Sequence, residues 1–244
     1  MSLNTRVLLK PLAVALSLAV APFAQAADVN LITAQMPPFA NGPDAEDKGM
    51  AIDLVAEMVK RADLEMTVTY EPWPRAVKSI ETTTNNFLAP PFRTPEREDK
   101  FSWVAKLLSA NQIFVTQGAA INSFEDARGL EKISVLRGSA MEKVLTEQGF
   151  TNLHPVTSDV QGEKLLVAGR VDAMYSVDIV TNDETTAGGF LRSDFTMGAP
   201  VVVSENWLAA NLDLDPAVKT AMSVAMDSMR TDGTYEAIVT KYLN

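Results

Sequence analysis

The sequence predicts an α/β fold in two parts, each with a mainly parallel sheet, because strand-like segments alternate with segments of helical spacing. In the first third of the chain, strand-like runs at residues 28–34, 65–70 and 87–89 alternate with helical patterns at residues 49–62 and 74–82. The alternation starts again after Ser123, and no long linker lies in between. Two such series in direct succession indicate two lobes that share a tight connection.

The spacing of apolar residues identifies the elements of the first series. In residues 49–62 the apolar side chains recur on one helical face, formed by Met50, Leu54, Val55, Met58, Val59 and Ala62. Residues 65–70 alternate in polarity, as expected of a half-buried strand. Pro74 favours the start of a helix, because proline fits the first turn, where its missing N–H would bond nothing.

The second series is built in the same way. Strands are expected over residues 132–136, 153–156 and 171–175, and helices over residues 158–168 and directly after Gly138-Ser139. Ser123, three residues before Asp126, marks the start of a short helix. Two amphipathic helices end the chain, the first opened by Pro216 and separated from the second by Gly233.

The composition excludes several classes of partner. The chain has 244 residues, a formal net charge of −10, one histidine and no cysteine. An acidic protein is a poor match for nucleic acid or for an anionic lipid surface, because both need basic patches. We expect no cofactor and no metal, since His154 has no second histidine to pair with and its neighbour Pro155 indicates a loop.

Residues 1–26 have the pattern of a secretory signal peptide. Arg6 and Lys10 precede an apolar run at residues 12–20, and Ala24-Gln25-Ala26 provides the small residues of a cleavage site. The apolar run is too short to span a bilayer comfortably, which favours a signal peptide over an N-terminal anchor helix. Without cysteine the mature protein has no lipid anchor and no disulfide, so we expect it to be soluble in the periplasm.

A charge-dense stretch at residues 93–102 directly follows the apolar run at residues 87–92. Charge of this density at the end of a strand fits either a solvated turn or the rim of a polar site. Arg97 lies in the middle of the stretch, next to Glu96 and Glu98. From spacing alone, a surface ion pair with one of these acids, or with Asp99, is the simpler interpretation of Arg97.

The order of short motifs resembles that of the family 3 extracellular solute-binding proteins, the periplasmic receptors of polar amino acid ABC transporters. The motifs are Gly49-Met-Ala-Ile-Asp53-Leu54, Pro72-Trp73, Thr94-Pro95-Glu96-Arg97 with Phe101-Ser102, residues 123–129, Gly169-Arg-Val-Asp-Ala173, and Asp232-Gly233-Thr-Tyr235 with Lys241-Tyr242. Each motif alone is weak, but six in the right order are specific. They cover essentially the whole mature chain.

The resemblance implies a type II periplasmic binding protein fold. In this fold two α/β lobes, each a mixed and mostly parallel sheet flanked by helices, are joined by two crossing strands and close on a ligand between them. The crossings are expected near residues 108–112 and 203–206, which assigns residues 27–109 and 206–244 to lobe 1 and residues 110–205 to lobe 2. The resemblance also implies a transient partner, an ABC permease in the inner membrane, and we expect the protein itself to be a monomer.

The same resemblance places a ligand carboxylate on Arg97. The chemistry fits, because a guanidinium can donate two parallel hydrogen bonds to one carboxylate. Ser139 is a second candidate, since it precedes a helix whose free N–H groups attract negative charge. A structural role is also open for Ser139, which forms a capping box pattern with Glu142.

Four further residues are candidates for substrate binding. Trp73 can form a flat apolar wall against the ligand or belong to the core, and Arg75 beside it is a second cation. Asp178 can bind an ammonium group or stabilise the first turn of a helix. Met36 stands where the family has an aromatic side chain, so one side of the usual ring clamp is missing.

Other departures from the family pattern limit the substrate. Pro90 and Phe92 replace the Gly and Thr that precede the family's Thr-x-Glu-Arg, which removes a hydroxyl that would contact the ligand. By spacing, the ammonium-binding acid falls on Val177, and Asp178 is one residue late. We therefore expect carboxylate recognition to be retained and an α-ammonium subsite to be altered, which leaves an amino acid or a related organic acid as ligand.

Two other functions stay open from the sequence. The chain has no Gly-x-Ser-x-Gly elbow and no cysteine, so common nucleophiles are absent. The fold nevertheless also hosts a periplasmic cyclohexadienyl dehydratase, and Asp178 or Glu184 could serve as a general acid. A ligand-sensing module that acts in trans is the third class. The expected function is capture of a small carboxylate for an ABC importer, without catalysis.

Overall fold

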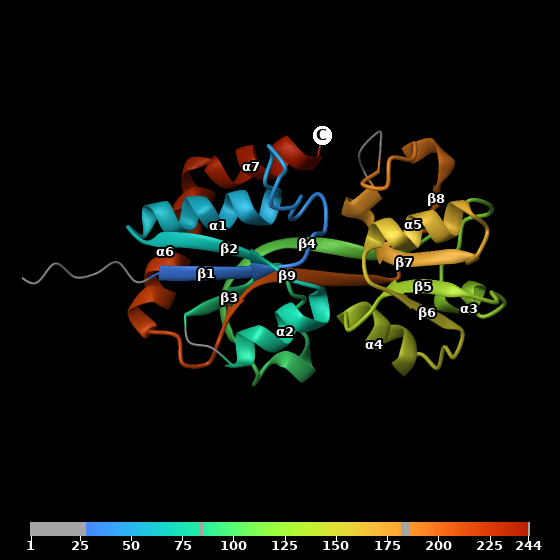
Figure 1. The fold of residues 1–244 in the computed structure, drawn as a ribbon, viewed down its shortest axis with the longest axis horizontal. Coiled ribbons are helices and arrows are strands. Elements are labelled where there is room, and N and C mark those ends of the chain that lie inside the picture. Colours follow the sequence, from blue (N-terminus) through green and yellow to red (C-terminus); the bar gives the residue numbers. More distant parts are fainter. Residues whose placement is uncertain (1–27, 83–84, 182–185, 244) are drawn as a thin grey trace, which may run out of the picture.

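The computed structural model describes residues 28–82, 85–181 and 186–243, which form two lobes joined by long strands (Figure 1). The predicted signal peptide, residues 1–26, lies outside these residues. In the part of the chain that is described, no helix is both long and apolar enough to cross a membrane.

Lobe 1 begins with the predicted series. It contains β1 (Asp28–Thr33), α1 (Met50–Arg61), β2 (Glu65–Tyr70), α2 (Trp73–Thr82) and β3 (Asn86–Leu88). β1 pairs in parallel with both β2 and β3. The apolar face of α1 is buried, as its spacing predicts, and α1 and α2 cover opposite faces of this half of the sheet (Figure 1).

Lobe 2 contains the second predicted series. Its elements are α3 (Phe124–Ala127), β5 (Ile133–Leu136), α4 (Ala140–Glu147), β6 (Leu153–Val156), α5 (Asp159–Val167) and β7 (Ala173–Val177). β5 pairs in parallel with both β6 and β7. The short elements η2 (Asp178–Thr181), η3 (Arg192–Asp194) and β8 (Thr196–Met197) follow, and β8 pairs with β4 (Ser102–Thr116).

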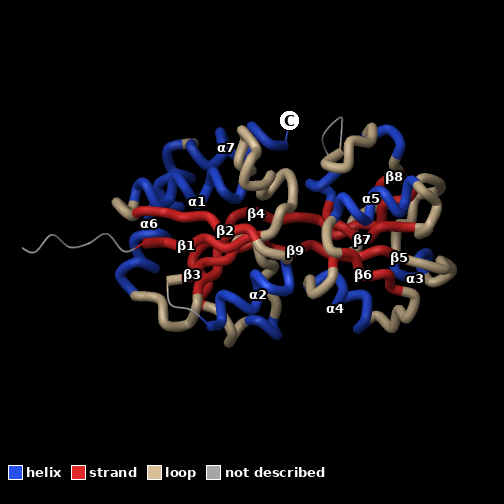
Figure 2. Tube along the Cα trace, viewed as in Figure 1, coloured by secondary structure: helices blue, strands red, loops and turns tan. Residues whose placement is uncertain are grey.

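Two crossing strands join the lobes, which confirms that expectation. β4 has 15 residues, a length of roughly 50 Å at about 3.3 Å per residue, and it pairs antiparallel with β9 (Val202–Ala210). At one end β9 pairs with β3, and at the other β4 pairs with β7. The sheet order is therefore β2-β1-β3-β9-β4-β7-β5-β6 (Figure 2). We propose that lobe 1 comprises residues 27–109 and 206–244 and lobe 2 residues 110–205.

The terminal helices α6 (Pro216–Asp232) and α7 (Thr234–Leu243) return to lobe 1 (Figure 1). Their anchor is Arg61 at the end of α1, which donates to Asp232 (2.7 Å) and to Thr234 (2.8 Å). Tyr242 donates its hydroxyl to Asp53 near the start of α1 (2.6 Å). Lobe 1 is therefore discontinuous in the sequence, because its last two helices follow lobe 2.

Candidate functional site

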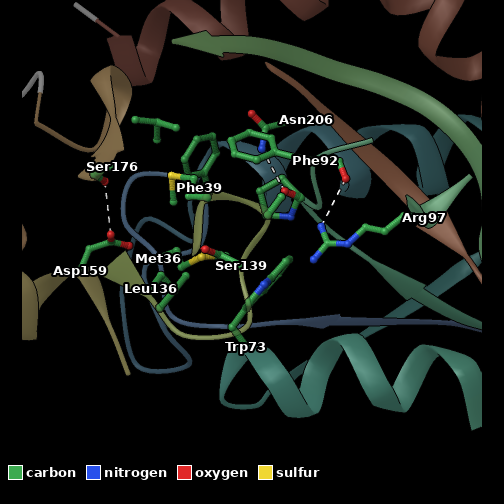
Figure 3. A pocket seen from close by; sticks show the side chains of 14 residues that line it. Met36, Phe39, Trp73, Phe92, Arg97, Leu136, Ser139, Asp159, Ser176 and Asn206 are labelled. Carbon is green, nitrogen blue, oxygen red and sulfur yellow. Dashed lines mark hydrogen bonds between the residues drawn. The ribbon is translucent and has the colours of Figure 1, made fainter. Parts of the chain in front are cut away.

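A narrow pocket lies between the lobes and is lined by residues of both (Figure 3). Lobe 1 provides Met36, Phe39, Trp73, Phe92 and Arg97, and lobe 2 provides Ser139, Asp159 and Ser176, among others. The cavity volume is about 40 Å³, a few times the ~10–15 Å³ that one buried water requires. In this arrangement of the lobes the pocket therefore has room for only a few atoms.

Met36 and Phe39 are held in a tight loop before α1. The N–H of Met36 donates to Ala40 O (2.9 Å), and the N–H of Phe39 donates to Met36 O (2.8 Å). Gly49 ends the loop with a φ of +110°, and a Cβ there would lie 2.6 Å from Phe39 O. Only glycine fits this backbone, which explains the first glycine of the Gly-x-x-x-Asp-Leu motif.

Trp73, at the start of α2, forms a wall of the pocket and is only 4% exposed. Trp73 is therefore both a buried core residue and a wall of the cavity, so both interpretations of it from the sequence hold. Its Nε1–H is buried and has no hydrogen-bond partner in the described part of the chain. A buried donor without a partner destabilises the protein by about 1–3 kcal/mol, so the indole can donate to a bound acceptor.

Arg97 ends the short helix η1 (Pro95–Arg97) and lines the pocket. Its Nη1 donates to Phe92 O (3.3 Å; Figure 3), and within the described residues it forms no ion pair. The neighbouring acids are engaged elsewhere, since Glu96 pairs with Lys143 and Glu98 with Arg93. Burial lowers the pKa of the Arg97 guanidinium, while the charge of Glu96 opposes that shift.

Ser139 caps α4 and also lines the pocket, at 8% exposed. Its Oγ accepts from the N–H of Glu142 (3.1 Å). The capping box is not reciprocal, because the Glu142 carboxylate accepts from the N–H of Gly138 (2.6 Å) rather than from Ser139. A Cβ on Gly138 would lie 3.1 Å from Cγ of Pro74, which shows how closely α4 approaches α2.

Two candidates from the sequence lie outside this pocket. Arg75 is exposed on α2 and does not line it. Asp178 accepts from the N–H of Asn111 (3.2 Å), from its Nδ2 (2.7 Å) and from the N–H of Ile179 (2.9 Å). This carboxylate therefore fixes η2 to β4, which is its structural interpretation, whereas Val177 does line the pocket, in agreement with the spacing argument.

The acid that the structure places in the pocket is Asp159, which the sequence analysis did not single out. Asp159 is 7% exposed, and its carboxylate accepts from Ser176 Oγ (3.3 Å; Figure 3). Burial raises the pKa of Asp159 to about 6, and the charge of Glu163 one turn away adds to the shift. The sequence contained one signal for Asp159. Ser158 caps α5 by accepting from the N–H of Gln161 (3.2 Å), so Asp159 is not needed as the capping residue.

Phe39 and Asn206 were also missed as lining residues, and Phe92 was noted only as a departure from the family pattern at the pocket. Asn206 lies on β9, where its Nδ2 donates to Pro90 O (2.9 Å), while its Oδ1 is buried without a partner in the described part of the chain. The signal for Phe39 was the Pro37-Pro38-Phe39 sequence that directly follows the candidate Met36. Asn206 is brought in by the antiparallel bridge that it forms with Phe92, a long-range pairing that no local pattern reveals.

Another candidate, His154, does not line the pocket. His154 was expected in a loop, but it lies exposed in β6, where the strand pairs with β5 opposite Ser134. Glu184 lies outside the described residues. Within the residues described, no group of three or more His, Cys, Asp or Glu side chains could hold a metal ion.

Comparisons with known proteins agree with this architecture. The sequence profile of the bacterial extracellular solute-binding proteins, family 3, matches residues 29–244. The histidine-binding periplasmic protein of Escherichia coli (strain K12) is 25% identical over 219 residues, which cover 80% of this chain and 79% of that protein. The putative ABC transporter arginine-binding protein 2 of the same strain is 26% identical over 227 residues, 86% of this chain and 87% of its own.

A solved structure supports the same fold. The ancestral amino acid-binding protein AncCDT-1, a precursor of cyclohexadienyl dehydratase, superposes with a TM-score of 0.76 at 20% identity, over 89% of this chain and 96% of that one. The profile match extends over both lobes and the crossing strands. The chain belongs to the bacterial extracellular solute-binding proteins, family 3.

Proposed function

We propose that this protein captures a small carboxylate-bearing solute, an amino acid or a related organic acid, and delivers it to an ABC importer. The observation that carries the proposal is Arg97, a half-buried cation in a largely apolar interlobe pocket, with no acidic partner among the described residues. A carboxylate ligand would supply that partner and accept two parallel hydrogen bonds.

Family membership and the relatives support an exported receptor that works with a transporter, and the remaining parts of the proposal are predictions from the sequence. The protein is exported, loses residues 1–26 and acts in the periplasm. It binds its solute as a monomer without altering it and meets the permease in the inner membrane transiently. Ser139, Trp73 and Met36 contact the ligand beside Arg97, whereas Arg75 and Asp178 have structural or solvent-facing roles.

Ligand-induced stabilisation tests the proposal. Mature protein is incubated with amino acids and small organic acids, and thermal unfolding is followed together with mass spectrometry of the recovered solute. A ligand at about one hundred times its dissociation constant adds roughly 2.7 kcal/mol to the free energy of unfolding. We expect at least one carboxylate to stabilise the protein and to be recovered intact.

The variant Arg97→Ala separates the site from non-specific anion binding. It is expected to lose the ligand-induced stabilisation, because it removes the only guanidinium that lines the described pocket. Arg75→Ala is the matched control, since it removes the same charge from an exposed position on the same lobe. Stabilisation that survives in Arg97→Ala would rule out the proposed carboxylate site.

A second candidate function is supported by one feature. Asp159 is a pocket acid whose pKa is raised to about 6, and such a group can act as a general acid near neutral pH. The likeness to AncCDT-1, a precursor of a dehydratase, makes an elimination reaction on a bound ring acid the reaction class to test. Conversion of prephenate or arogenate to an aromatic product that depends on Asp159 would favour the enzyme over the receptor.

A further inference from the structure

Two opposite charges line the pocket without pairing. Arg97 comes from lobe 1 and Asp159 from lobe 2, and Figure 3 shows them at opposite ends of the cavity, with the apolar side chains of Met36, Phe39 and Trp73 in the region between. Neither Arg97 nor Asp159 forms an ion pair within the described residues, with each other or with another side chain. The half-buried Arg97 and the buried Asp159 therefore both lack the counter-ion that would offset their desolvation.

The surroundings of Asp159 offer little compensation. On its own helix the nearest charged group is Glu163, an acid that is engaged by Thr186 Oγ (2.8 Å) and Gly188 N–H (2.8 Å). From β7, only the Ser176 hydroxyl donates to it, at 3.3 Å. Buried carboxylates are ordinarily paired or fully hydrogen-bonded, so Asp159 has unused capacity to accept from a ligand.

We propose, on the basis of the proposed function, that Asp159 with Ser176 forms a second ligand subsite, which binds a cationic nitrogen separated from the ligand carboxylate by an apolar spacer. The ligand then completes both ion pairs at once and connects lobe 1 to lobe 2. This subsite differs from the α-ammonium position, which falls on Val177 and has no charge. Displacement of the acid from that position favours an ω-amino acid or a longer cationic acid over a simple α-amino acid.

Isomeric probes test the position of the nitrogen directly. 4-Aminobutanoate and 2-aminobutanoate have the same atoms and the same charges and differ only in the site of the amine. Butanoate lacks the amine, and 5-aminopentanoate lengthens the spacer by one methylene. Binding of each is measured by isothermal titration calorimetry to the full mature chain at low salt, where ion pairs are least screened.

We expect the ω-amino acids to bind more tightly than both butanoate and 2-aminobutanoate. In Asp159→Asn, which keeps the shape of the side chain, their affinity is expected to fall at least about 30-fold, because one partner of a buried ion pair is lost. Butanoate affinity is expected to stay the same in this variant. Asp227→Asn, the same substitution at an exposed position on α6, serves as the control and should change none of the four affinities.

The outcomes distinguish this inference from the proposed function. A preference for 2-aminobutanoate, or an ω-amino preference that persists in Asp159→Asn, overturns the subsite and leaves carboxylate capture intact. Binding of butanoate, but of none of the three amino acids, also overturns the subsite and leaves carboxylate capture intact. Binding of none of the four acids overturns the subsite and leaves carboxylate capture to the wider screen, whereas binding that is insensitive to Arg97→Ala overturns both. Thermal unfolding without ligand shows whether Asp159→Asn is folded, so loss of binding is not mistaken for loss of structure.

Discussion

The two walls of the pocket are built on different principles. The lobe 1 wall consists of loops whose backbone is fixed locally, such as the Met36 turn before α1 and the short helix that carries Arg97. The lobe 2 wall consists of the start of α4, the start of α5 and the strand β7, with Asp159 as its charged group. The lobe 1 wall thus places aromatic rings and the Arg97 cation on a backbone that steric contacts hold in position. The lobe 2 wall instead places the acid Asp159, whose protonation state depends on its electrostatic surroundings.

Gly49→Ala should break the lobe 1 wall and is the largest effect that we expect. The new Cβ meets Phe39 O at 2.6 Å and the backbone of Ala40 at 2.7 Å, at a φ of +110° that alanine disfavours. The free energy of unfolding is expected to fall by roughly 3 kcal/mol, measured by urea denaturation.

Gly129→Ala is the control for this substitution, because a Cβ at that position has nothing within 4 Å. Its unfolding free energy should stay within about 0.5 kcal/mol of the wild type. Equal stability of Gly49→Ala and the wild type would show that the turn relaxes and does not fix the wall.

The pH dependence of stability tests the lobe 2 wall. The pKa of Asp159 is raised from 3.8 to about 6, so between those values the folded state binds a proton that the unfolded state has released. The contribution of this one carboxyl group to the stability of the ligand-free protein therefore falls as pH rises from about 4 to 6, by up to about 3 kcal/mol. Burial also raises the pKa of Glu163, which contributes in the same direction.

Asp159→Asn should remove its part of this slope and be more stable than the wild type near pH 7. Urea denaturation of wild type and variant at pH 4, 5, 6 and 7 measures both slopes, and their difference is the contribution of Asp159, since Glu163 and the other acids are common to both proteins. An unchanged slope would show that the Asp159 carboxylate is solvated or paired in solution.

The variant Trp73→Phe tests the lobe 1 wall further, because it removes one hydrogen-bond donor from this wall and keeps an aromatic ring. Because the indole Nε1–H is buried without a partner in the described residues, its loss should leave the ligand-free protein as stable or about 1 kcal/mol more stable. Affinity for a carboxylate should fall if this N–H donates to the ligand. Denaturation and calorimetry on the same preparation separate these effects. Because the smaller ring also leaves a cavity that lowers stability by itself, unchanged carboxylate affinity is the result that would contradict a role of this N–H in binding.

The smallest effect concerns the contact between the walls. Glu96 of lobe 1 pairs with Lys143 of lobe 2, and both side chains are largely exposed. Glu96→Gln removes this interlobe ion pair and is expected to weaken ligand binding no more than about threefold, an effect that high salt should abolish. Glu125→Gln, which breaks a pair with Arg128 inside lobe 2, should leave affinity unchanged and is the control.

Local patterns and motifs predicted most elements, and Met36, Trp73 and Arg97 of the lobe 1 wall. The helical face of α1, the strand alternation of β2 and the proline and glycine that bound α6 reflect interactions within a few residues. The motif around Arg97 indicated its role, although the motif could not show that Glu96 and Glu98 are paired elsewhere. The pair of Glu98 with Arg93 is local, but the pair of Glu96 depends on Lys143, nearly fifty residues later in the chain, and on the approach of the second lobe.

The lobe 2 wall could not be predicted in the same way. Asp178 and Asp159 are both acids at the first turn of a short helix, so their sequence patterns are nearly equivalent. Only the packing distinguishes them, because Asn111 on the crossing strand β4 engages Asp178, while Ser176 on β7 faces Asp159. The sequence alone determined the alternating elements, the acidic composition and the cation Arg97. The tertiary structure decided which acid faces that cation, because long-range strand pairing, and not local spacing, sets which side chains reach the space between the lobes.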